Sequence, residues 1–170
     1  MRIRDEAPAD WAEVERLNRL AFGGDAEAEL IARLRDDRLI ACALVAESFG
    51  MIVGHIAFSW LAAHVDRRAV EATALAPLAV HPDRQRRGIG SRLVVAGLAR
   101  AHAAGANAVI VLGHPAYYRR FGFSVSLAAK LEAPFSGEAF MALELTPGAL
   151  SGTLGTVAYP RAFGIPAGKK

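Results

Sequence analysis

The sequence has 170 residues, of which 53% are hydrophobic and 22% charged; this balance predicts one globular domain over residues 1–170 and excludes a disordered or collagen-like chain. A single cysteine excludes a disulfide scaffold, no apolar stretch is long enough to span a bilayer, and the charged N-terminus does not resemble a signal peptide, so we expect a cytoplasmic protein. The formal net charge of +3 leaves open a polyanionic partner, nucleic acid included.

The first part of the chain predicts an edge strand, two helices and a β-hairpin. Residues 2–6 form a short segment that starts with alternating polar and apolar side chains, and the two segments that follow carry apolar side chains at helical spacing. Gly23-Gly24 ends the first helix, and Phe49-Gly50 joins two apolar segments rich in strand formers. We expect the helices at 11–22 and 26–35 and the hairpin strands at 39–48 and 51–60.

The middle of the chain alternates strand, helix and strand. A strand over 71–80 leads through a turn at 81–87 into a helix over 89–104, and a short apolar strand follows at 108–112. This order predicts a right-handed crossover between parallel neighbours. Pro77 lies inside the first strand and cannot donate to a ladder, which implies a bulge or an unpaired side. Further on we expect a short helix near 115–120, a strand near Ser124, a final strand over 140–145 and an irregular tail over 146–170.

The turn after the strand at 71–80 is the strongest functional signal. It is basic and contains two glycines, Gly88 and Gly90, at the start of a helix, where backbone amides and the helix dipole favour anions. A glycine-containing helix start with solvated arginines is the alternative. The spacing does not fit a nucleoside-triphosphate P-loop, and Leu93 stands where a dinucleotide-binding motif needs a third glycine.

Two motifs carry a family resemblance. The segment from Gln85 to Gly90 resembles the acyl-CoA pyrophosphate motif of the GNAT superfamily of acyl-CoA-dependent N-acyltransferases, and the segment from Tyr118 to Phe123 matches a second signature of that superfamily. The resemblance, which extends to a bacterial subfamily of acetyltransferases, implies a mixed α/β fold. Its central sheet would be mostly antiparallel with two splayed parallel strands, and helices would flank it.

The resemblance also implies acetyl-CoA as cosubstrate. Backbone groups on the strand at 71–80 would bond the pantetheine amides, which would explain Pro77, and the turn would hold the pyrophosphate; a plain bulged core strand is the alternative. The cofactor-binding residues implied are Leu78, Ala79, Val80, Gln85, Arg86, Arg87, Gly88, Ile89, Gly90 and Ser91.

By the same resemblance Tyr118 would give a proton to the departing thiolate and Glu71 would be the general base, an exposed strand-end carboxylate being the alternative for Glu71. His55, on the preceding hairpin strand, ranks behind Glu71 as a candidate base. The expected reaction is acetyl transfer to a primary amine by direct attack in a ternary complex. The acceptor, a small-molecule amine or a peptide or protein amine, stays open, as does a homodimer. The alternative is a non-catalytic acyl-CoA sensor of the same fold. We expect no metal, nucleic acid or membrane partner.

Overall fold

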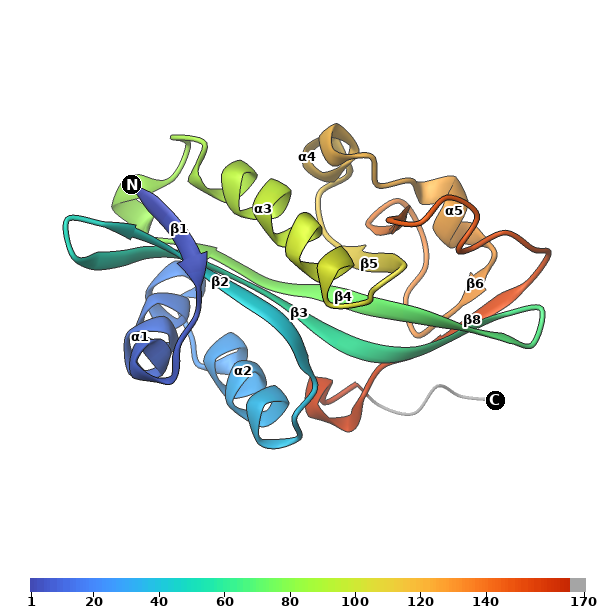
Figure 1. Ribbon diagram of the computed structural model, residues 1–170, viewed down its shortest axis with the longest axis horizontal. Coiled ribbons are helices and arrows are strands. Elements are labelled where there is room, and N and C mark those ends of the chain that lie inside the picture. The colour runs from blue at the N-terminus through green and yellow to red at the C-terminus, as the bar shows by residue number, and fades with distance from the viewer. Residues whose placement is uncertain (166–170) are drawn as a thin grey trace. The chain divides into compact units, whose positions relative to one another are not determined.

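The computed structural model describes residues 1–165 and divides them into two compact units (Figure 1). The first unit consists of Met1–Ser59 and Ala76–Ala101, and the second of Trp60–Leu75 and the chain from His102 onward. Two long strands, β3 (Met51–Val65) and β4 (Arg68–Val80), belong partly to each unit. That residues 1–170 form a single domain stays a prediction.

The first unit is a sheet with helices on both sides. Strand β1 (Arg2–Asp5) pairs antiparallel with β2 (Ile40–Ser48), which pairs antiparallel with β3. In Figure 1, α1 (Trp11–Phe22) and α2 (Ala26–Asp36) lie on one side of these strands and α3 (Ile89–Ala103) on the other. On the α1 side, Val14 and Leu17 pack with Val45, Ile52 and Ala79 in one buried cluster. Apolar spacing on α1 thus fixes the face that the helix buries.

The second unit contains the parallel strand pair. Strand β5 (Ala108–Leu112) pairs parallel with β4 from Ala72 to Ala74, as the crossover rule predicts, and β7 (Phe140–Glu144) pairs antiparallel with β5. Strand β8 (Gly155–Ala158) pairs antiparallel with β3 and parallel with the short β6 (Leu131–Glu132). After β5 come α4 (Pro115–Tyr118), the 3-10 turn η3 (Arg119–Phe121) and α5 (Val125–Ala129).

The predicted fold class, a mixed α/β architecture with a mostly antiparallel sheet, is confirmed, but two local predictions are wrong. The strand expected near Ser124 is a single bridge to Ala142, because the Ser124 hydroxyl accepts a hydrogen bond from the Leu127 amide and caps α5 instead. The strand β7 is not the last one, since β8 forms within the tail expected to be irregular. Residues 166–170 of that tail lie outside the described residues.

Candidate active site

The turn that joins β4 to α3 has the geometry of an anion-binding helix start. After β4, the short η2 (Pro82–Arg84) is closed by a 2.8 Å hydrogen bond from the Arg84 amide to the His81 carbonyl. Gly88 has a φ of 81°, a left-handed conformation that glycine adopts without strain, and its carbonyl accepts the amide of Arg92 at 3.1 Å. The first N–H groups of a helix have no carbonyl one turn earlier to donate to, so the amides of Ile89 and Gly90 at this helix start can be offered to an anion.

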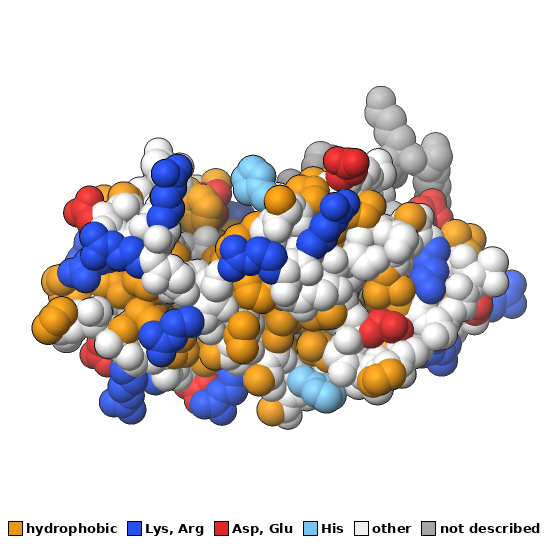
Figure 2. All heavy atoms as spheres, turned by 90° about the horizontal axis from the view of Figure 1, so that it is seen from above, with side chains coloured by type: hydrophobic (Ala, Val, Ile, Leu, Met, Phe, Trp, Pro, Cys, Tyr) orange, Lys and Arg blue, Asp and Glu red, His pale blue; other side chains and the backbone are white. Residues whose placement is uncertain are grey.

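The turn is also exposed and basic. Gln85, Arg86, Arg87 and Gly88 are all exposed, whereas Ile89 is buried and anchors the start of α3. Figure 2 looks onto the face that carries α3, and basic side chains are prominent at its left end, where the turn lies. Guanidinium groups beside exposed amides favour a phosphate-bearing ligand.

The residues predicted to bind pantetheine are the last three of β4, next to the turn. Ala79 is buried, while Leu78 and Val80 are half-buried on either side of it. The Val80 carbonyl accepts a 3.1 Å hydrogen bond from the side-chain amide of Gln85, so the two ends of the turn are tied together. This bond fixes Gln85 as a support of the turn.

In the second unit Tyr118 lies at the end of α4 within an aromatic cluster. Its ring is 5.0 Å from the Tyr117 ring and 5.6 Å from the Phe123 ring, both edge to face. Gly113 allows this packing, because a Cβ at that position would lie 2.5 Å from Cε2 of Tyr118. Burial, with a smaller contribution from Tyr117, raises the pKa of Tyr118 to about 12. The hydroxyl therefore stays protonated at neutral pH and is able to donate a hydrogen bond.

The structure does not bring Glu71 and Tyr118 together. Glu71 is exposed, and its carbonyl accepts the Asn107 amide at 2.7 Å, next to the first residue of β5. Tyr118 follows the last residue of β5, Leu112. The two ends of this five-residue strand are four steps apart, about 13 Å at roughly 3.3 Å per residue. The role of Glu71 as general base stays a prediction.

The structure also places His55 in a buried polar cluster that the sequence analysis did not predict. His55, ranked as a second candidate base, is fully buried in the first unit, with its Nδ1 atom 3.3 Å from the Asn18 side-chain nitrogen and its Nε2 atom 3.4 Å from Glu6. Glu6 in turn binds Arg35. No sequence spacing signals this cluster, because its members come from α1, α2, β3 and the loop after β1.

Two further features of residues 1–165 concern metal binding and membrane crossing. Within residues 1–165 no three His, Cys, Asp or Glu side chains are grouped so that they could hold a metal ion. In the same part of the chain, no helix has the length and apolar character that a membrane crossing requires.

Comparison with known proteins agrees with both motifs. Residues 2–126 match the family model described as an acetyltransferase (GNAT) domain. The Escherichia coli protein YhbS, named as an uncharacterised N-acetyltransferase, is 36% identical over 166 residues, which cover 96% of this chain and 98% of YhbS.

Solved structures agree as well. The crystal structure of Escherichia coli YhbS in complex with CoA matches with a TM-score of 0.87 and 35% identity, covering 98% of this chain and 93% of that one. A GNAT family acetyltransferase from Brucella melitensis in complex with acetyl-CoA matches with a TM-score of 0.78, also at 35% identity, covering 95% of this chain and 97% of that one. The family predicted from the two motifs is confirmed: this chain belongs to the GNAT acetyltransferase family.

Proposed function

We propose that this acetyltransferase moves an acetyl group from acetyl-CoA to a primary amine by direct attack in a ternary complex. The observation that carries the proposal is the exposed, basic turn at the start of α3, with its left-handed Gly88 and the helix N-terminus behind it. The CoA and acetyl-CoA complexes of the two relatives support the same ligand.

The cosubstrate would be held mainly by the backbone. In our proposal the amides from Arg86 to Ser91 bind the pyrophosphate, and Gln85 holds the turn through its bond to Val80. Backbone groups of Leu78, Ala79 and Val80 would bind the pantetheine arm as an added strand does. Since Gln85 already donates to the Val80 carbonyl, the remaining lone pair of that carbonyl is the one left for the ligand.

The reaction balances without a further reactant. The amine nitrogen bonds to the acetyl carbon, the carbon–sulfur bond breaks, and the amine loses one proton while the thiolate gains one. We assign the hydroxyl of Tyr118 to the sulfur, where a protonated donor stabilises the leaving thiolate. The raised pKa, about 12, keeps this donor in its neutral form over the whole physiological range.

The test compares two tyrosines with similar surroundings. Tyr159 also has a pKa raised by burial to about 12 and lies in an edge-to-face aromatic cluster, so Tyr159→Phe is a matched control for Tyr118→Phe. Release of free CoA is measured over a panel of polyamines, aminoglycosides, amino acids and peptides, and acetyl-CoA binding is measured by calorimetry. We expect Tyr118→Phe to lower kcat by roughly 100-fold or more and to leave acetyl-CoA affinity nearly unchanged, with Tyr159→Phe active.

Each outcome is informative. Equal turnover in the two variants would remove Tyr118 from the mechanism. Tight acetyl-CoA binding with no acetylated amine across the panel would favour the non-catalytic sensor, and absence of acetyl-CoA binding would contradict the proposal as a whole.

A further inference from the structure

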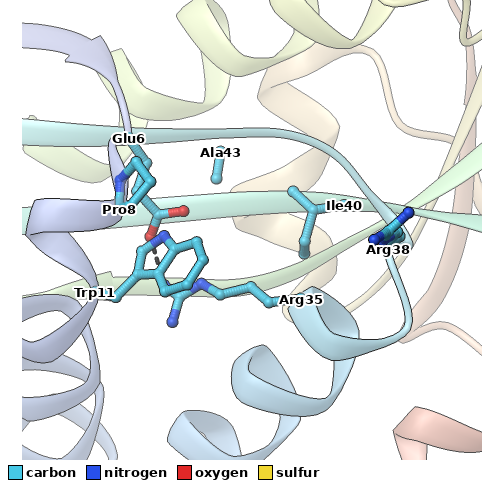
Figure 3. A pocket seen from close by; sticks show the side chains of 7 residues that line it. All are labelled: Glu6, Pro8, Trp11, Arg35, Arg38, Ile40 and Ala43. Carbon is cyan, nitrogen blue, oxygen red and sulfur yellow. Dashed lines mark hydrogen bonds and ion pairs between the residues drawn. The ribbon is translucent and has the colours of Figure 1, made fainter.

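The first unit contains a pocket whose lining does not include the turn between β4 and α3. It has a volume of about 320 Å³ and lies between the end of β1, the start of α1, the end of α2 and the start of β2 (Figure 3). Its lining combines charged side chains with an apolar wall and consists of Glu6, Pro8, Trp11, Arg35, Arg38, Ile40 and Ala43. We call it the Glu6 pocket. Neither of the two family motifs contains any of these residues.

One end of the Glu6 pocket carries a buried negative charge. The side chains of Glu6 and Arg35 are each only 8% exposed, and they pair at 2.6 Å. Arg35 also pairs with Glu15 at 3.3 Å, so two carboxylates share one guanidinium. Burial alone would raise the pKa of Glu6, but His55 and Arg35 lower it by more than burial raises it. The pKa is lowered overall, so the carboxyl is ionised at neutral pH.

Glu6 has an oxygen to offer to a ligand. The ion pairs of its carboxylate with Arg35 and His55 use the same oxygen, Oε1. Figure 3 shows the other oxygen pointing into the open space of the pocket. Beside it lies the Trp11 ring, 41% exposed, with the Arg35 guanidinium 4.8 Å from its centroid. A carboxylate next to an aromatic surface is a site for an ammonium group.

The other end of the pocket carries a positive charge. Arg38 is exposed just after α2, and its guanidinium forms no ion pair with any residue between 1 and 165. In Figure 3 Glu6 and Arg38 lie at opposite ends of the lining, with Ile40 and Ala43 between them. The pocket is therefore dipolar, with an apolar middle.

We propose that the Glu6 pocket binds a small zwitterion whose ammonium and carboxylate are separated by a short apolar segment. The ammonium contacts the Glu6 oxygen that points into the pocket, beside the Trp11 ring, the carboxylate contacts Arg38, and the apolar segment packs on Ile40. Amino acids and short peptides have this chemistry. The proposal does not depend on acetyl transfer, because the binding is measured without acetyl-CoA.

A purely structural role for the same residues makes a different prediction. The Glu6–Arg35 pair joins the end of β1 to the last turn of α2, and it would do so without any ligand. Arg38 takes no part in that pair. A substitution at Arg38 therefore separates ligand binding from folding.

The experiment is calorimetry on the full chain with three zwitterions of increasing charge separation: leucine, leucylglycine and 6-aminohexanoate. Hexylamine and hexanoate, each with one of the two charges, are the controls for the third probe. We expect at least one zwitterion to bind, and 6-aminohexanoate to bind about tenfold more tightly than hexylamine or hexanoate, since each charge-assisted contact contributes about this factor. Arg38→Gln should remove that advantage, and Arg16→Gln, at an exposed position of α1, should not.

Glu6→Gln provides a second arm, read together with its melting temperature, because it also weakens the pair with Arg35. It should abolish amine binding, whereas Arg38→Gln should melt like the parent protein and abolish only the contribution of the carboxylate. The proposal is overturned if no zwitterion binds, or if binding is the same in the parent protein and in Arg38→Gln.

Discussion

Replacement of Gly113 by alanine tests the packing of the proposed catalytic tyrosine. The new Cβ would lie 2.5 Å from Cε2 and 3.0 Å from Cδ2 of Tyr118, well inside the carbon–carbon contact distance of about 3.5–4.0 Å. The ring is 9% exposed and contacts Tyr117 and Phe123, so it has to move by about 1 Å against packed neighbours. Overpacking of this kind costs about 1–3 kcal/mol, and melting should fall by roughly 2–4 °C for each kcal/mol.

Two comparisons isolate the cause of that loss. Gly24→Ala is the control, because nothing lies within 4 Å of a Cβ there, and its stability should be unchanged or slightly higher. A double-mutant cycle with Tyr118→Ala removes the ring that the new methyl group meets, so Gly113→Ala should then cost almost nothing. Urea unfolding measures all four variants. An equal cost of Gly113→Ala with and without the Tyr118 ring would refute the packing argument.

Two further predictions concern carboxylates. The Asp10 carboxylate accepts hydrogen bonds from Arg4 at 2.7 and 2.9 Å and from the Ala7 amide, which together lower its pKa from an ordinary value of 3.8 to about 2 despite burial. The lowered pKa stabilises the fold above pH 3.8, and this stabilisation is lost as pH falls toward 2. Asp10→Asn should therefore lower the free energy of unfolding, measured in urea, by about 1–2 kcal/mol near neutral pH and by almost nothing near pH 2. A loss independent of pH would contradict this prediction. Glu71→Gln tests the predicted general base: because Glu71 and Tyr118 lie near opposite ends of β5, we expect kcat to fall less than about tenfold, whereas a fall like that of Tyr118→Phe would support Glu71 as the base.

Helix α1 was predictable because its information is local. Val14 and Leu17 recur at helical spacing and are buried, and the helix has the bounds that the pattern predicts. Strand β3 runs five residues past the predicted end at Trp60, to Val65. In that extension Leu61, Ala63 and Val65 are buried and their neighbours are exposed, but alanine on both faces hides the alternation in the sequence.

Strand β8 could not be predicted in the same way. Its partner is the end of β3, where Ala158 lies opposite Ala62, 96 residues earlier in the chain. Four residues with two glycine or alanine positions carry too little strand propensity to show themselves, and the pairing depends on a tertiary neighbour. The strand forms because its buried Val157 joins the core of the second unit, not because of its own sequence.

The two kinds of site differ in how visible they are, for a physical reason. A turn that binds an anion through consecutive amides needs glycine and a helix start within a few residues, so Gly88 and Gly90 stand two positions apart in the chain. The Glu6 pocket needs only side-chain charges that the fold brings together, and Glu6 and Arg35 are 29 residues apart with no spacing rule between them. The cosubstrate is therefore read from motifs, whereas any selectivity for amines or zwitterions has to be read from the folded chain.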